Sequence, residues 1–111
     1  MTVHLGIDFG TTRSVVAVCD RGNYPVVSFL GEHGDPLDSY PSIVAETRGS
    51  LLYGLDAARA ARASEATFVR SFKRLLSDPL VRPDQQVQVG QLRVGLLALL
   101  TGFLEALRRD L

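Results

Sequence analysis

The sequence predicts an α/β fold in which an antiparallel strand meander is followed by a small strand pair and two or three helices. Two apolar runs, Val3–Ile7 and Val15–Cys19, flank a short group of small and polar residues, which is typical of two strands joined by a tight hairpin. Alanine-rich and leucine-rich segments with helical spacing follow in the second half of the chain. The 111 residues contain no repeat, low-complexity tract or linker, so we expect a single unit.

The composition narrows the possible partners and the compartment. Twelve basic residues balance twelve acidic ones, so the chain lacks the positive charge expected for binding nucleic acid or an anionic membrane. Cys19 is the only cysteine, which excludes an internal disulfide and favours a reducing compartment. The first residues lack the charged region of a signal peptide, and the longest apolar stretch, Leu92–Leu107, is too short for a comfortable membrane span. We therefore expect a cytoplasmic protein.

The first half of the chain is predicted to be mostly extended. Pro25–Leu30 has the composition of a third meander strand and precedes a polar loop. Tyr40–Glu46 is predicted to be extended, because a residue before proline is kept out of the helical region. After a turn, Leu51–Gly54 is predicted to form a short return strand.

The second half is predicted to be mainly helical. Asp56 is a good N-cap for a helix over Ala57–Ala63. Apolar residues at helical spacing predict another helix over Thr67–Leu76, with one buried face made of Phe68, Phe72, Leu75 and Leu76. A small hairpin is expected over residues 86–94, turning at Gly90.

The last segment, Gly95–Asp110, is predicted to be a helix with one apolar stripe. The stripe consists of Leu96, Leu97, Leu100, Phe103, Leu104, Leu107 and Leu111.

The connection between the first two strands has the chemistry of a phosphate site. Gly10 allows the backbone to turn tightly or to approach a ligand, and Thr11 and Thr12 place hydroxyls beside their amides. Asp8 places a carboxylate at the end of the first strand. Amides suit an anion and a carboxylate suits a metal ion or its waters, so this turn is a candidate site for a phosphate and its Mg²⁺. A plain glycine hairpin without a ligand is the alternative.

At these residues the chain resembles a known family. Gly6-Ile-Asp-Phe-Gly-Thr-Thr-Arg-Ser14, followed by Val-Val-Ala-Val, resembles the first phosphate motif of the heat-shock-70 (DnaK-like) chaperones, which belong to the superfamily of actin, sugar kinases and heat-shock ATPases. Tyr40-Pro-Ser-Ile-Val-Ala45 and Phe72-Lys-Arg-Leu-Leu76 resemble two further family segments, and Gly54 followed by Ala57 resembles the start of a family helix. The resemblance covers most of the chain and implies part of the ribonuclease-H-like first lobe of an actin-type ATPase.

Several features depart from the family pattern. Ser64–Phe68 replaces an Asn-Pro-x-Asn-Thr sequence, and Arg13 stands where Asn or Tyr is usual. The stretch between Leu76 and the last helix is short, as in the compact bacterial branch. Family members are also far longer than this chain. We therefore expect residues 1–111 to be the opening segment of a nucleotide-binding domain, without the second lobe or the peptide-binding domain.

The resemblance implies a role for each residue of the phosphate motif. Asp8 would hold Mg²⁺ through water, and the amides of Gly10, Thr11, Thr12 and Arg13 would surround the β- and γ-phosphates. Thr11 would also place its hydroxyl near the attacking water, where positioning and charge stabilisation are the main catalytic devices.

Lys73 is the only lysine in the chain, and it lies at the family's phosphate-contacting position. Its compact ammonium would act as a point charge on a γ-phosphate oxygen, a role that the planar guanidinium of Arg would not reproduce. With Asp8 and Thr11 it forms the set of candidate catalytic residues. A solvated lysine on a helix surface is the alternative.

The resemblance further implies that the whole protein binds ATP or ADP with Mg²⁺ and couples hydrolysis to the binding and release of unfolded polypeptides. Its work would belong to protein folding and the stress response, with co-chaperones as partners. This segment has only one side of the phosphate site, so we expect negligible ATPase activity from it alone. In the family, the last helix would also touch later strands. Without those strands the apolar face of this helix would be left uncovered, which predicts self-association through residues 96–107. A sugar-type kinase and a non-catalytic interaction module are the alternative functions.

Overall fold

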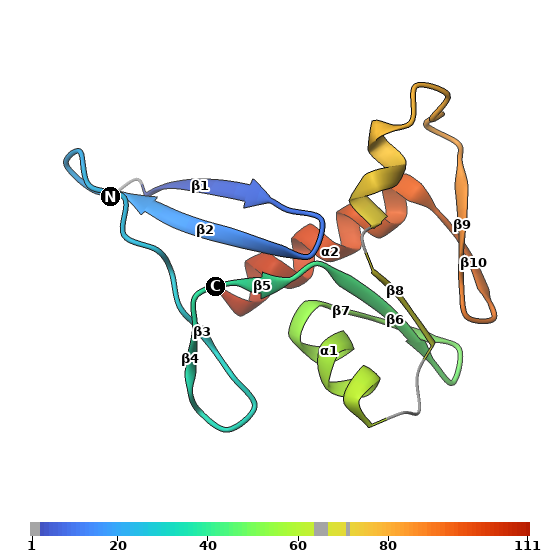
Figure 1. Ribbon diagram of the computed structural model, residues 1–111, viewed down its shortest axis with the longest axis horizontal. Coiled ribbons are helices and arrows are strands. Elements are labelled where there is room, and N and C mark those ends of the chain that lie inside the picture. The colour runs from blue at the N-terminus through green and yellow to red at the C-terminus, as the bar shows by residue number, and fades with distance from the viewer. Residues whose placement is uncertain (1–2, 64–66, 71) are drawn as a thin grey trace.

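The computed structural model describes residues 3–63, 67–70 and 72–111. Within these residues the chain forms two three-stranded sheets, two further strand pairs and two α-helices, so the expected α/β class with antiparallel strands is confirmed. Figure 1 shows the longer helix, α2 (Leu96–Asp110), passing behind the first sheet. No helix in the described part of the chain is long and apolar enough to cross a membrane.

The first sheet has the strand order β1-β2-β5. β1 (His4–Phe9) and β2 (Arg13–Cys19) form the expected antiparallel hairpin, in a register that pairs Phe9 with Ser14. β5 (Tyr40–Pro41) pairs with the start of β2 and leaves β1 at the edge of the sheet. The hairpin prediction is therefore confirmed.

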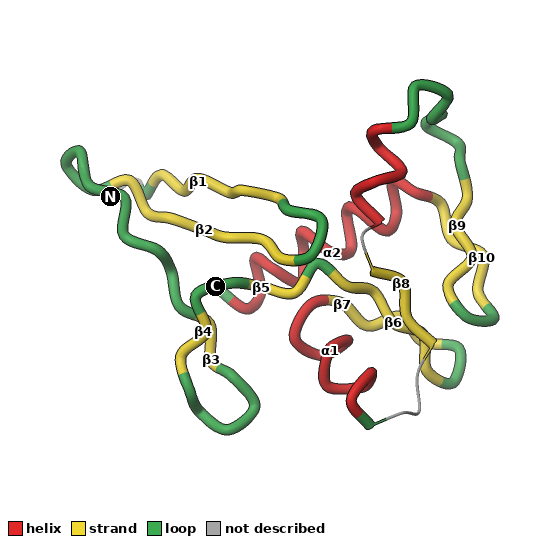
Figure 2. The backbone as a smooth tube through the Cα atoms, in the orientation of Figure 1, coloured by secondary structure: helices red, strands yellow, loops and turns green. Residues whose placement is uncertain are grey.

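The prediction of a third meander strand over Pro25–Leu30 is wrong in its second half. Residues 25–27 do follow the edge of β2, where the Val27 N–H donates to the Val16 carbonyl at 2.7 Å. The chain then leaves this sheet, and β3 (Phe29–Leu30) pairs with β4 (Pro36–Leu37) in a separate hairpin (Figure 2). The reason is competition for one edge, because β5 pairs with the other end of β2.

The second sheet has β6 at its centre, in the order β7-β6-β8. β6 (Ile43–Thr47) pairs with β7 (Ser50–Tyr53) and with β8 (Thr67–Arg70), both antiparallel. The extended structure expected near Tyr40–Glu46 and Leu51–Gly54 is thus confirmed.

The expected helix over Thr67–Leu76 is wrong. Its first part is the strand β8, and its second part is a 3-10 helix, η1 (Phe72–Ser77). The free edge of β6 offers backbone partners to residues 67–70, and this distant pairing overrides the local helical spacing. Leu76 is exposed rather than buried, and the side chains of Phe68 and Phe72 lie outside the described part of the structure.

Helix α1 (Gly54–Arg62) packs on one side of the second sheet, where Ala57 meets Ile43 of β6. Asp56 was expected to be its N-cap, but Tyr53 holds that position and Asp56 lies in the first turn. The helix begins at Gly54, which takes a φ of +61° and packs so closely under the Tyr40 ring that a Cβ would collide with it.

The expected small hairpin is confirmed as β9 (Gln86–Val89) and β10 (Leu92–Gly95). Its turn is tied to the second sheet by Glu46, whose carboxylate accepts from the N–H of Gln91 at 2.9 Å and of Gly49 at 3.1 Å. These two donors hold the pKa of Glu46 below its usual range.

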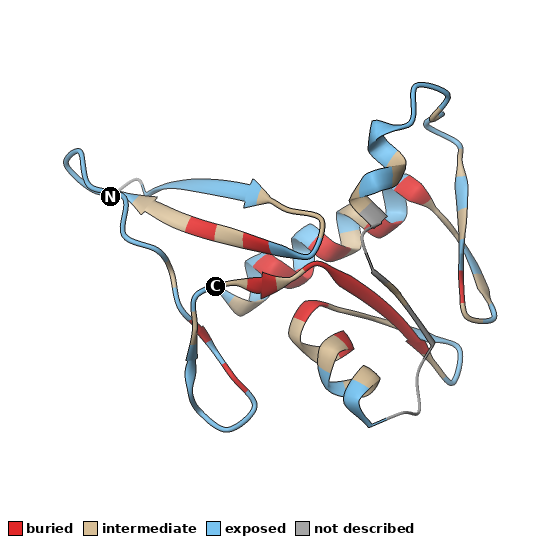
Figure 3. Cartoon of the chain, in the orientation of Figure 1, coloured by how far each residue is buried: buried red, intermediate tan, exposed pale blue. Residues whose placement is uncertain are grey.

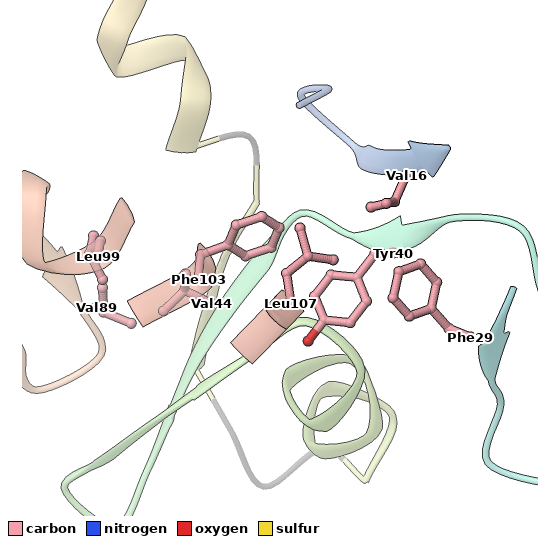
Figure 4. Close-up of a cluster of buried hydrophobic side chains, with 8 residues drawn as sticks. All are labelled: Val16, Phe29, Tyr40, Val44, Val89, Leu99, Phe103 and Leu107. Carbon is pink, nitrogen blue, oxygen red and sulfur yellow. The ribbon is translucent and has the colours of Figure 1, made fainter. Parts of the chain in front are cut away.

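The main core joins both sheets to α2, as the buried residues in Figure 3 indicate. Its central ring is Tyr40, which lies 4.9 Å from the ring of Phe29 and 5.7 Å from that of Phe103 and donates to Asp110 Oδ2 at 2.6 Å. Burial, aided by that carboxylate, raises the pKa of Tyr40. The close-up in Figure 4 labels the cluster, which comprises Val16, Phe29, Tyr40, Val44, Val89, Leu99, Phe103 and Leu107.

Helix α2 has nearly the expected bounds, but its buried face is turned from the expected stripe. Leu96, Phe103 and Leu107 are buried as expected, together with Leu99 and Ala106, which the stripe omitted. The remaining apolar positions at spacings of seven are exposed, namely Leu97, Leu104 and Leu111. The apolar stripe is wider than the surface that the sheets bury, so the sequence pattern alone does not show which part of it faces them.

Candidate functional site

The turn between β1 and β2 is built around Gly10. A Cβ at this position would collide with the carbonyl oxygen of Arg13, so the tight turn requires glycine. Thr11 is half-buried, whereas Thr12 and Arg13 are exposed. The turn therefore presents its polar groups to solvent at one end of the sheet.

This turn is hydrogen-bonded to the segment Tyr40–Ala45, which also resembles the family. The Ser42 N–H donates to the Thr12 carbonyl at 3.0 Å, and the buried hydroxyls of Ser14 and Ser42 lie 3.0 Å apart. The β2–β5 pairing sets Ser14 opposite Tyr40. The two segments that carried most of the family resemblance thus lie side by side (Figure 1). Sequence reasoning assigned no role to Ser42, although a serine in each segment was the available signal.

Asp8 is exposed near the end of β1, opposite Val15 in the hairpin register. Successive side chains of a strand point to opposite faces, so Asp8 and Phe9 face opposite sides of the sheet. Phe9 stacks on Phe103 of α2, with ring centroids 5.4 Å apart. Asp8 therefore lies on the face that α2 leaves open.

Lys73 comes from η1, which Figure 1 shows in gold beside the end of the hairpin. Its Nζ lies 5.6 Å from the centroid of the Phe9 ring, a distance suited to a cation–π interaction. Among the residues that the structure describes, no carboxylate lies within ion-pair distance of this ammonium. Lys73 is thus brought to the tip of β1, on the face opposite the Asp8 side chain.

The donor set at this end of the sheet fits a magnesium-bound phosphate better than a free metal ion. Within the described ranges, no group of three or more His, Cys, Asp or Glu side chains could hold a metal. Mg²⁺ bound to nucleotides usually needs only one or two carboxylates, because phosphate oxygens and water complete its shell. The Asp8 carboxylate, the amides of residues 10–13 and the Lys73 ammonium match that requirement.

A separate groove of about 580 Å³ lies between β7 and α2. None of the phosphate-motif residues lines it, so it is distinct from the hairpin end. Burial, aided by the Glu105 charge, raises the pKa of Tyr53 in its wall. The lining residues are Leu51, Tyr53, Ala98, Gly102, Glu105, Ala106 and Arg109.

Comparisons with known proteins identify the family of the chain. A family model described as Hsp70 protein matches residues 4–99, which include the hairpin, Ser42 and Lys73. The chaperone protein DnaK of Stenotrophomonas maltophilia (strain R551-3) is 33% identical over 95 residues, which cover 85% of this chain. The match covers 14% of that relative, so this chain spans a small part of the relative's length. The expected membership is confirmed: the chain belongs to the Hsp70 family.

Proposed function

We propose that this chain supplies one side of an Hsp70 nucleotide site, and that the site takes ATP or ADP with Mg²⁺. The observation that carries the proposal is the approach of the Lys73 ammonium to Phe9, the residue that lies between Asp8 and Gly10 in the chain. A cation, a carboxylate and a turn of backbone amides come from segments far apart in sequence, and they gather at one end of one sheet. A packing role for Lys73 alone would not call for the other two groups.

The roles follow from the chemistry of each group. The N–H groups from Gly10 to Arg13 would bind the β- and γ-phosphate oxygens, and they are oriented in advance by the turn that Ser42 holds. Lys73 would balance charge on a γ-phosphate oxygen. Asp8 would hold Mg²⁺ through its waters, and Thr11 would orient the attacking water. Bound ATP supplies the phosphoryl group, and Mg²⁺ neutralises charge on its oxygens.

For the whole protein, we propose ATP hydrolysis coupled to polypeptide binding and release, with co-chaperones as partners, in the cytoplasm. The support is family membership and the DnaK relative, which is named a chaperone. We propose further that residues 1–111 form part of the ribonuclease-H-like first lobe. A sugar-type kinase does not fit the family found, whereas the non-catalytic interaction module stays an alternative for this segment.

The segment alone is proposed to bind nucleotide weakly and to hydrolyse it negligibly. The groups proposed to bind phosphate face solvent at the end of the hairpin, so water is not excluded from the reacting phosphate. The expected self-association through residues 96–107 stays a prediction, which the exposure of Leu97 and Leu104 supports.

The test is a titration of the 111-residue chain with Mg-ADP and Mg-ATP, followed by backbone amide NMR. We expect shifts concentrated at Gly10–Arg13, and we expect them to weaken in Lys73→Met. The matched control is Arg74→Met, which removes an exposed cation one residue along η1. The proposal would be contradicted if both variants weakened the amide shifts equally, or if the shifts occurred away from the hairpin.

A further inference from the structure

We propose that Phe9 is a positioning residue of the phosphate site, and that its ring holds the Lys73 ammonium in place for a phosphate oxygen. This role rests on the proposed function, since it makes Phe9 part of the nucleotide site described above. The Lys73 Nζ lies 5.6 Å from the centroid of the Phe9 ring. An aromatic face attracts a cation that lies within about 6 Å of its centroid, so the ring is a partner for this ammonium.

The Phe9 ring is itself fixed by the core. It stacks on Phe103 of α2, with the two ring planes inclined by 20° and their centroids 5.4 Å apart. Phe103 is fully buried, and Phe9 is half-buried and packs against the main core. In the hairpin Phe9 pairs with Ser14, whose hydroxyl is buried against that of Ser42. A ring anchored in this way restricts the end of a long side chain that would otherwise sample many rotamers.

The ring holds Lys73 without neutralising its charge. None of the ion pairs within residues 3–63, 67–70 and 72–111 includes Lys73. A carboxylate in the place of the ring would pair with the ammonium, and a phosphate would then have to displace it. An aromatic face attracts the cation through its quadrupole, and the N–H donors that point away from the ring stay available for phosphate oxygens. Lys73 is therefore held as a charged donor.

The alternation of β1 keeps the cation apart from the acid of the same site. Asp8 and Phe9 are consecutive in the strand, so their side chains lie on opposite faces of the first sheet. Lys73, which Phe9 holds, is thereby kept from pairing with the Asp8 carboxylate. A magnesium-bound phosphate at this end of the sheet would then find the acid for its metal and the ammonium for its oxygen.

The first test detects the contact in the chain without nucleotide. Lys73 is the only lysine, so labelling with ¹³C-lysine gives a single set of side-chain NMR signals. The ring current should shift the protons of the Lys73 ε-methylene upfield of those of lysine in an unstructured peptide. Phe9→Leu, which keeps an apolar side chain without a π face, should remove this shift, and Phe9→Tyr should retain it. A wild-type signal at the unstructured-peptide value would overturn the proposal without recourse to a variant.

The second test measures the Kd of Mg-ATP by NMR titration of the 111-residue chain. Phe9→Leu should raise this Kd about threefold, and Phe9→Tyr should bring it back close to the wild-type value. In the Lys73→Met background, Phe9→Leu should leave the Kd unchanged, because a positioning residue acts only through the side chain that it positions. An effect of Phe9→Leu that is equally large in both backgrounds would show a purely structural role and would overturn the proposal.

Phe29→Leu provides the matched control. It removes another aromatic side chain of the same core, one that packs on the ring of Tyr40. This variant should change neither the ε-methylene signal nor the Kd, and circular dichroism melts check that each variant remains folded.

The role of Phe9 and the proposed function fail in different ways. If the wild type binds no Mg-ATP, the nucleotide site is wrong and the role of Phe9 is overturned with it. If Lys73→Met weakens binding and Phe9→Leu does not, the nucleotide site stands and only the role of Phe9 is overturned.

Discussion

β6 and β1 are strands of similar length in opposite situations. β6 is buried at four of its five residues and has a partner on both edges, whereas β1 is exposed along nearly all its length and has a partner on one edge. Figure 3 shows the contrast, with β6 in red and β1 in pale blue. The comparison indicates different roles for the two strands: β6 is the centre of the second sheet, whereas β1 carries Asp8, which is proposed for Mg²⁺, and leads into the Gly10 turn.

The largest expected effect is on the free energy of unfolding, when the same change, Ile to Ala, is made in each strand. Ile43→Ala in β6 should lower the free energy of unfolding by about 2–5 kcal/mol, because Ile43 is only 4% exposed and packs between the sheet and α1. Ile7→Ala in β1 should cost much less, since half of that side chain is already in water. Urea unfolding of both variants measures the difference. Equal losses would show that β1 is as deeply packed as β6.

The next effect concerns the hydrogen bond that joins the hairpin to Ser42, the residue before β6. Ser14→Ala should cost about 1–3 kcal/mol, because it leaves the buried Ser42 hydroxyl without its partner. Ser14→Ala/Ser42→Ala should cost less than the sum of the two single changes. A double-mutant cycle by urea unfolding gives the coupling, and strict additivity would rule out the proposed link.

A smaller effect distinguishes two glycines of the same hairpin. Gly10→Ala should destabilise the chain by more than about 1 kcal/mol, because the new Cβ meets the Arg13 carbonyl. Gly6→Ala should be close to neutral for the monomer, since its Cβ enters open space. Thermal unfolding of both variants tests this, and a stable Gly10→Ala chain would mean that the turn is looser than described.

The smallest expected effect depends on pH and concerns the end of β6. The folded-state pKa of Glu46 is lowered by two backbone donors, so its stabilising contribution is complete above the pKa of the unfolded chain and is lost as the pH falls through the folded pKa. The thermal midpoint of the wild type should therefore exceed that of Glu46→Gln at pH 7. The gap should narrow in acid, below the usual glutamate range. A gap that is constant with pH would contradict this assignment.

Local patterns predicted the elements whose partners are near in sequence. The β1–β2 hairpin, the β9–β10 hairpin and α2 all follow from alternation, turn residues and helical spacing. The residues proposed for the phosphate site were also chosen from a local motif, a glycine turn with an acid and hydroxyls, and their role stays a prediction. The errors lie where distant segments compete for one edge, as for the strand expected over Pro25–Leu30 and the helix expected over Thr67–Leu76.

The sequence by itself determined the family, the α/β class and the identity of the proposed phosphate residues, because these depend on residue types at short spacings. Only the tertiary structure decided that Lys73 reaches Phe9, that Ser14 meets Ser42 and that Glu46 ties two turns together. It also decided which face of α2 is buried and that β1 is left at an open edge. Such contacts join residues far apart along the chain, and their free energy depends on how the segments pack rather than on any one segment's pattern.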